Sequence, residues 1–274
     1  MDSLAADIMR AVEDGSLKLP TLPEVALRIR QCEKDPNLDN LGLTRVIEHD
    51  PATTAQLLRI ANSPLVRREV KVADLSKAIS LLGMSYCAKV AISISTRQLF
   101  NSKNPASEKR MREIWQHSLN VACHCYVLAN KARLVPEEAF LAGLLFKIGT
   151  LPIIAMADNN EGYSLDELNT TLDQIHPMLG ESILSHWQFP RSIADIPQNY
   201  RDNNRYVPSI DLCDLVTIAH NRVCSEDKRI QWNDIAALER MGWHSSSIEE
   251  EFTKLSADIE LAYDVFEFNG PREL

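Results

Sequence analysis

The chain has 274 residues, 45% of them hydrophobic and 24% charged, and its formal net charge is −9 at pH 7. This composition is ordinary for a soluble globular protein, and the length is enough to bury one large core or two packed lobes. A negative chain supplies no general field that attracts nucleic acid or an anionic membrane, so we expect neither as a partner. The low glycine and aromatic content favours helices over a turn-rich β architecture.

The sequence suggests a protein of the cytoplasm. Asp2 follows Met1 and no apolar segment comes next, so no export signal is visible. The six cysteines include no C-x-x-C pair, which indicates reduced thiols. The apolar stretch 139–157 contains Lys147 and Pro152. A membrane span needs about 20 apolar residues in a row, so we expect a buried helix, a break and a second helix.

The first hundred residues are typical of short helices with capping signals at their ends. Thr21 and Glu24 match a capping box, which predicts a helix start at Thr21. Asp50, followed by Pro51, predicts the start of a second helix. Asp74 opens a third helix and Gly83 ends it. A longer helix is expected from about residue 85 to 100.

The polar, proline-containing segment 101–107 is the best internal boundary. It divides the chain into an N-terminal helical lobe, 1–103, and a second helical lobe, 104–274, that ends in an amphipathic helix. No segment alternates at period two over a strand's length, so the predicted fold class is all-α. The helices expected in the second lobe cover about 107–132, 136–145, 164–171, 177–187, 191–199, 210–223 and 247–266.

The order of these segments resembles a known family. Residues 19–37, 46–64 and 73–100 carry apolar runs bounded by Asp-Pro, Ser-Pro or Gly. This pattern closely resembles the HDOD domain, a bacterial signalling relative of the HD and HD-GYP metal-dependent phosphohydrolases, and the resemblance covers about residues 17–265. It implies an HD-domain-like multi-helical bundle with an N-terminal helical lobe.

The resemblance also locates the positions of the metal ligands. In HD hydrolases one helix contributes a His, the next an adjacent His-Asp pair, and later helices add His and Asp. In this chain His117 stands at the first position, and Phe146-Lys147 replaces the His-Asp pair. His176 resembles the next ligand. The last Asp is replaced by His220 or Asn221.

These replacements predict a degenerate metal site. Phe146 has no lone pair to offer, and Lys147 brings a positive charge to a place meant for a cation. A later His-rich stretch of the family reads Gln198-Asn199-Tyr200 here. We therefore expect no metal, no cofactor and no catalytic residue. The candidates for a remnant pocket are His117, Lys147, His176, His220 and Asn221.

The resemblance implies a non-catalytic signal-transduction module that acts through protein partners. One alternative is a metal-dependent phosphohydrolase with a variant ligand set built from the three histidines. Another is a pocket in which Lys147 binds a small anion or a nucleotide without hydrolysing it. Lys147 could instead pair with a neighbouring acid or extend to solvent.

Overall fold

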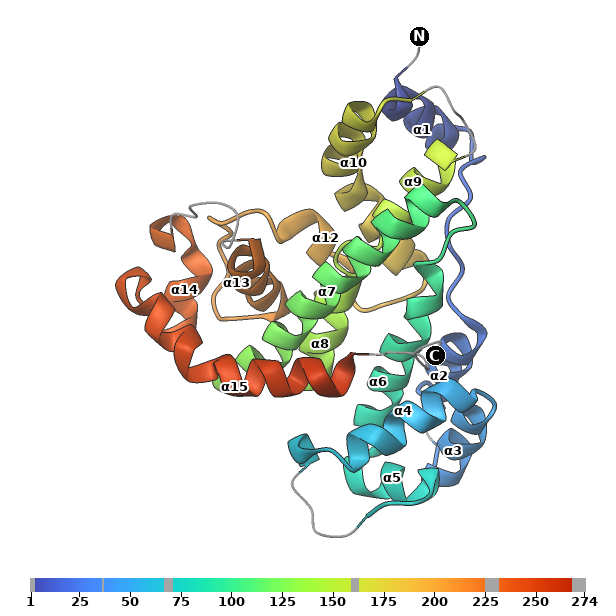
Figure 1. Cartoon of the computed structure of the whole chain (residues 1–274), viewed down its shortest axis with the longest axis vertical. Coiled ribbons are helices and arrows are strands. Elements are labelled where there is room, and N and C mark those ends of the chain that lie inside the picture. The colour runs from blue at the N-terminus through green and yellow to red at the C-terminus, as the bar shows by residue number, and fades with distance from the viewer. Residues whose placement is uncertain (1–2, 36, 67–70, 159–162, 225–231, 268–274) are drawn as a thin grey trace.

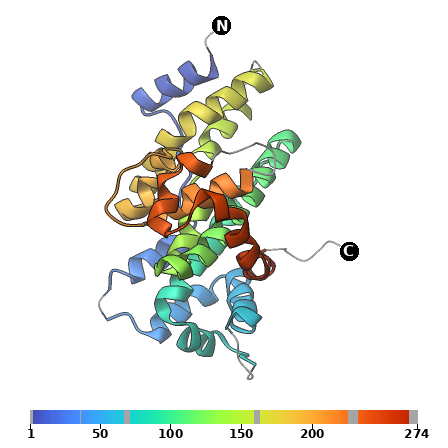
Figure 2. The ribbon, with the colours of Figure 1, turned by 90° about the vertical axis from the view of Figure 1, so that its left-hand side faces the viewer.

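The computed structural model describes residues 3–35, 37–66, 71–158, 163–224 and 232–267. Within these ranges the chain forms helices and no strands, which confirms the predicted all-α fold class. Figure 1 shows a long central helix, with the short helices of residues 24–82 grouped below it and to its right and the first helix, 4–13, at the top of the view; Figure 2 shows the same arrangement turned by 90°.

The N-terminal lobe is a group of short helices around one longer helix. Its elements are α2 (Glu24–Cys32), α3 (Asn40–Glu48), α4 (Pro51–Ala61), η1 (Pro64–Val66), α5 (Leu75–Leu82), α6 (Met84–Thr96) and η2 (Arg97–Leu99). The longer helix, α6, packs against α2 and α4 and also contacts the second lobe. It is therefore buried on nearly all sides, and its second half consists of apolar and small polar residues.

Three of the predicted helix ends in this lobe are confirmed. The Asp50 carboxylate accepts a hydrogen bond from the backbone N–H of Ala52, and that of Asp74 accepts one from Lys77. Gly83 ends α5 with a φ of +91°, a backbone conformation that a residue with a side chain rarely adopts. This glycine allows α6 to leave α5 at a bend of 116°.

The predicted capping box at Thr21 and Glu24 is wrong. Helix α2 begins at Glu24 itself, with Pro23 at the N-cap and no side-chain cap. The reason is local, because the residue before a proline is pushed out of the helical region. Leu22 precedes Pro23 and so cannot form the first helical residue that a start at Thr21 requires.

The second lobe is built on the longest helix. The longest helix is α7 (Pro105–Ala132). The lobe also contains α8 (Pro136–Leu145), α13 (Leu212–Cys224), η3 (Trp232–Asp234), α14 (Ala236–Met241), η4 (Ser245–Ser247) and α15 (Ile248–Phe266). Helices α8, α13 and α15 pack against α7 (Figure 1). As predicted, α15 is amphipathic, with Phe252 and Leu255 buried and three glutamates in its first turn.

The apolar stretch around Lys147 is two helices separated by a break, as predicted. Helix α8 ends at Leu145, a turn follows, and α9 covers Thr150–Asp158. By length and hydropathy the region Pro136–Asp158 could cross a membrane, and 83% of its most apolar window is buried inside the protein. Among the described residues, the bent pair formed by α5 and the region after it also passes this test if both are counted as one span.

Helix α10 (Leu165–His186) is continuous, whereas the sequence predicted two helices separated before Pro177. A proline inside a helix leaves the carbonyl four residues earlier without its N–H donor. That carbonyl belongs to Asp173, and it accepts a hydrogen bond of 2.8 Å from Arg201. The tertiary contact replaces the missing helical bond. The helix begins with a capping box between Ser164 and Glu167.

The remaining helices are short. They are α1 (Leu4–Glu13), α11 (Arg191–Ala194) and α12 (Ile196–Asn199). Helix α1 was not predicted from the sequence. It packs against α9 and α10 around a small second core that includes Leu4 and Ile8. The predicted helix 191–199 is divided at Asp195 into α11 and α12. The main core runs from Leu22 to Phe266 and crosses the predicted lobe boundary.

Candidate functional site

Five segments converge on the position that the resemblance assigns to the metal. Helix α7 contributes His117, the turn after α8 contributes Phe146 and Lys147, and α10 contributes His176. The residue after α12 is Tyr200, and α13 contributes the last member, His220. The five segments are distant in the sequence, so only the tertiary fold can bring them together.

Phe146 occupies the centre of this group. Its side chain is fully buried, and its ring meets that of Tyr200 at a centroid distance of 4.8 Å and an interplanar angle of 87°. The imidazole centroids of His220 and His117 lie 5.5 and 6.0 Å from the Phe146 centroid. An apolar ring therefore packs against both imidazoles, at the position where the resemblance expects a metal-ligating His.

His117 and His220 contact each other directly. The Nε2 atom of His117 lies 3.2 Å from Nδ1 of His220, so one imidazole donates a hydrogen bond to the other. Burial, and then the positive charge of Lys147, lowers the pKa of His117 to about 4 and that of His220 to about 2. Both rings are therefore neutral at pH 7.

His176 belongs to a separate hydrogen-bonded chain. Its Nδ1 atom lies 2.6 Å from the carbonyl oxygen of Leu172, which can only accept, so Nδ1 carries the proton. Nε2 then accepts from the Tyr200 hydroxyl at 3.0 Å, and that hydroxyl accepts from Nε of Arg201 at 2.8 Å. Burial lowers the pKa of His176 to about 4. Both nitrogens of His176 are engaged, which leaves no lone pair for a metal.

Of the two residues proposed for the last ligand position, His220 is the one in this group. The Asn221 side-chain amide donates to the carbonyl of Thr217 at 2.9 Å and to the side-chain oxygen of Asn203 at 3.3 Å. Cys224 was not among the predicted site residues, and its sulfur lies 3.7 Å from Nδ1 of His220. Their spacing of four residues on one helix was the signal for this contact.

His117, His220 and Cys224 form the one cluster of three His, Cys, Asp or Glu side chains, among the described residues, whose ligand atoms lie within 4.8 Å of one another. It contains no carboxylate. The sulfur of Cys224 is 3.7 and 3.8 Å from the two nitrogens of His220. Because these distances are nearly equal, neither in-plane lone pair of that ring points at the sulfur. The cluster is therefore poorly arranged to hold an ion.

Lys147 is a partly buried cation beside this group. Its Nζ atom lies 5.4 Å from the centroid of the Phe146 ring. Among the described residues, no carboxylate oxygen lies within 4.0 Å of Nζ. Burial lowers the pKa of this amine to about 8. The pairing with a neighbouring acid, one of the alternatives for this lysine, is not found in the described part of the chain.

A cavity of about 210 Å³ opens beside Lys147. Helix α7 contributes Arg110 and Glu113 to its wall, and α10 contributes Asn169 and Asp173. The group around Phe146 thus has two parts. One is a closed apolar and imidazole cluster, and the other is an open, charged cavity with Lys147 in its lining.

Comparison with known proteins finds solved structures of similar fold. A structure from Shewanella amazonensis SB2B, provisionally named a metal-dependent phosphohydrolase, superposes with a TM-score of 0.82 at 22% identity, covering 96% of this chain and 98% of that one. A structure from Marinobacter aquaeolei VT8, provisionally named a signal transduction protein, gives a TM-score of 0.64 at 18% identity over 97% of this chain and 66% of that one. At these identities the likeness shows the fold alone.

A curated relative, an uncharacterized protein of Treponema pallidum (strain Nichols), is 20% identical over 206 residues. The match covers 70% of this chain and 38% of that protein, so the chain spans well under half of its relative's length. The profile of the HDOD domain matches residues 19–202. This match covers more than half of the sequence and agrees with the helical order described above, and the chain therefore belongs to the HDOD domain family.

Proposed function

We propose that this HDOD protein is a non-catalytic signal-transduction module that acts through contact with protein partners. The observation that carries the proposal is the position of Phe146, a fully buried ring in contact with Tyr200, His117 and His220. A metal-dependent hydrolase needs an open coordination position at which bound water is activated. The buried ring of Phe146 beside the imidazoles supports a site without such an open position.

The charges around the site support the same proposal. Hydrolysis of a phosphoester by metal-bound water requires ligands that attract a divalent cation, and carboxylates are the usual source of negative charge. Lys147 instead adds a positive charge next to the imidazoles and lowers their pKa. A signalling role also agrees with the provisional name of the Marinobacter protein.

The test introduces the family's His-Asp pair at positions 146 and 147. We expect the purified wild type to contain no stoichiometric transition metal and to leave an activated phosphodiester intact in the presence of Mn²⁺. The double variant Phe146→His, Lys147→Asp should gain metal by elemental analysis, because it exchanges a ring and a cation for two ligands. The double variant Phe146→Leu, Lys147→Met is the matched control, since it changes the same positions without adding a ligand.

The alternative is a phosphohydrolase with a variant ligand set, and the same measurement detects it. About one or two metal ions per wild-type chain, together with hydrolysis that His117→Ala abolishes, would refute the proposal.

The proposed contact with protein partners has its own test. A partner captured from native cells should stay bound when EDTA is added, because the proposed interaction needs no metal. Release of the partner by EDTA would contradict the proposal.

A further inference from the structure

The open cavity beside Lys147 has more cations than carboxylates in its lining. Three cations line it: Lys147, Arg110 and Arg201. Its lining also contains two carboxylates, Asp173 and Glu113.

Both carboxylates already have basic partners. Asp173 accepts from Arg201 at 2.6 Å, and the carbonyl of the same residue also accepts from Arg201. Oε1 of Glu113 lies 4.0 Å from Nζ of Lys109, which is one helical turn away on the exposed face of α7. The third cation, Arg201, is thus neutralised by Asp173 and is held in place by its bond to Tyr200.

The other two cations have no such partner. Arg110 donates to the side-chain oxygen of Asn169 at 2.6 Å, which is a neutral acceptor. Among the residues that the structure describes, no carboxylate oxygen lies within 4.0 Å of the basic groups of Arg110 or Lys147. Lys89 provides a contrast, because this partly buried lysine of α6 pairs with Glu138 at 3.2 Å. The protein therefore places two cations without an ion-pair partner at one cavity, although Asp173 attracts Lys147 from a longer distance.

We propose that this cavity binds the phosphate group of a phosphorylated small molecule, with Lys147 at its inner side and Arg110 at its mouth. A guanidinium and an ammonium that are not engaged by carboxylates are the groups that form charge-assisted hydrogen bonds to phosphate oxygens. The Asn169 side chain, held by Arg110, lies in the same wall. The inference rests on the proposed function in one respect, namely that the bound ester stays intact.

The size of the cavity limits the ligand. Pockets that enclose a whole drug-sized ligand measure roughly 300–1,000 Å³, and this one measures about 210 Å³. It has room for a phosphate group and a small part of what is attached to it. A larger organic portion would extend through the open side, past the exposed residues Glu113 and Asp173. Free phosphate and a phosphomonoester offer the same chemistry to the two cations, and the experiment separates them.

The experiment measures melting temperature and calorimetric affinity with inorganic phosphate, glucose 6-phosphate and the nucleoside 5′-monophosphates, with sodium chloride added to keep ionic strength equal. A ligand that binds only the folded state raises its melting temperature. We expect phosphate compounds to stabilise wild type and Lys89→Met. Lys147→Met should lose at least about tenfold in affinity, since it lacks one charged hydrogen bond. Arg110→Gln, a change at the mouth that leaves the core intact, should also bind more weakly.

The outcomes separate the ligand sources and the two proposals. Binding of both free phosphate and the esters, or of the esters alone, supports the inference, and the second result identifies the ester as the ligand. Equal shifts in wild type, Lys147→Met and Arg110→Gln, or no shift with any compound, would overturn it. Phosphorus NMR of the same samples reports hydrolysis. Release of phosphate by wild type would refute the non-catalytic function, while the Lys147-dependent affinity would still decide whether the cavity binds phosphate.

Discussion

The ring of Phe146 stands edge-on to the ring of Tyr200, with 4.8 Å between the centroids and 87° between the planes. Aromatic pairs in this arrangement contribute about 0.5–1.5 kcal/mol beyond the burial of their area. The Tyr200 hydroxyl also donates to His176. The contact therefore joins the turn after α8 to α10 and α12, and Phe146 is part of the main core.

Lys147→Met should make the protein more stable. At pH 7 the variant removes a partly buried cation with no carboxylate within 4.0 Å in the described chain. We expect a gain of about 1 kcal/mol in the free energy of unfolding, measured by urea denaturation. Lys89→Met is the control, because it breaks an ion pair with Glu138 and should give no gain.

The same variant has a defined dependence on pH. Burial lowers the pKa of Lys147 from 10.5 to about 8, so between these values the unfolded chain binds more protons than the folded protein. The stability of wild type therefore rises as the pH increases through this window. The advantage of Lys147→Met should shrink between pH 8 and 10.5. A gain that stays constant over this range would show that the lysine titrates normally.

Gly149→Ala should be strongly destabilising. A Cβ atom on Gly149 would lie 2.0 Å from the carbonyl oxygen of His176 and 2.4 Å from the backbone nitrogen of Gly180. Both neighbours are backbone atoms of α10, which cannot move aside cheaply, and we expect a loss of about 3 kcal/mol in urea denaturation. Gly42→Ala is the control, since the nearest atoms there are side chains at 3.2 and 3.3 Å. Similar losses in both variants would contradict the close approach of the turn to α10.

Local signals explain the parts of the fold that could be predicted from the sequence. Asp50, Asp74 and Gly83 act on backbone groups within four residues of themselves, so their pattern is readable without the fold. The continuity of α10 could not be read in this way. The carbonyl left open by Pro177 is satisfied by Arg201, which only the tertiary structure brings near.

The candidate site could also be predicted only in part from the sequence. Resemblance to the HD pattern indicated His117, Lys147, His176 and His220. The rings of His117 and His220 pack against Phe146, and Lys147 and His176 line the adjacent cavity. The resemblance could not indicate that Tyr200 occupies the second nitrogen of His176, because that bond depends on how α12 packs on α10. The charge balance of the cavity also depends on contacts between distant segments, such as Arg201 with Asp173.

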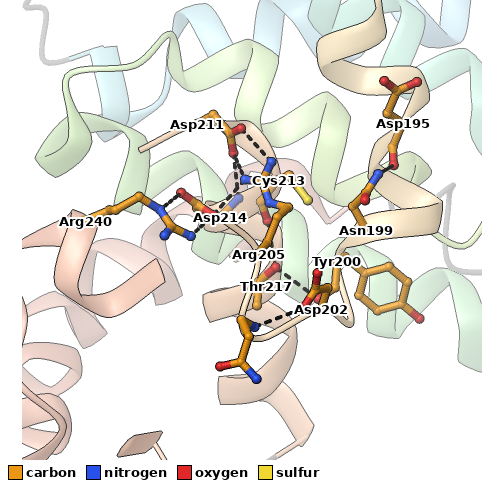
Figure 3. A network of polar contacts seen from close by, with 11 residues as sticks. Asp195, Asn199, Tyr200, Asp202, Arg205, Asp211, Cys213, Asp214, Thr217 and Arg240 are labelled. Atoms are coloured by element: carbon orange, nitrogen blue, oxygen red, sulfur yellow. Dashed lines mark hydrogen bonds and ion pairs between the residues drawn. The ribbon is translucent and has the colours of Figure 1, made fainter. Parts of the chain in front are cut away.

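Asp214→Asn should destabilise the attachment of α14. The Asp214 carboxylate is 1% exposed and accepts from Arg205 at 2.7 Å and from Arg240 at 2.7 and 2.8 Å (Figure 3). Arg205 keeps its bonds to Asp211, but Arg240 loses its carboxylate partner, so the variant should lose about 3–5 kcal/mol in urea denaturation at pH 7. Asp195→Asn breaks the exposed pair with Arg191 and should cost under about 1 kcal/mol.

The protonation of Asp214 changes the stability with the same sign as that of Lys147, but in the acid range. Burial raises the pKa of Asp214, but the hydrogen bonds from Arg240 and Arg205 outweigh it, so the pKa lies below its ordinary value of 3.8. The stability that this carboxylate contributes is complete above pH 3.8 and is lost as the pH falls through its folded pKa. Asp214→Asn should therefore flatten the acid limb of the stability profile. An unchanged acid limb would show that other groups determine it.

The two predicted lobes, 1–103 and 104–274, should unfold together. Helix α6 of the first lobe packs against α8 of the second. Arg59 donates to the carbonyl of Val265 at 2.6 Å, and the indole of Trp187 donates to that of Pro20 at 3.0 Å. Calorimetry of the whole chain should show one transition whose calorimetric and van't Hoff enthalpies agree.

Separate expression of the two lobes tests the shared core directly. Each fragment alone would expose apolar surface that the other covers, so neither should melt cooperatively. Co-expression of the two fragments is the control, because it restores the interface without the covalent link and should recover a folded complex with one transition. Two fragments that are each soluble and melt cooperatively would mean that the lobes are independent domains. The cavity beside Lys147, which is built from the second lobe alone, would then bind phosphate in residues 104–274 without the first lobe.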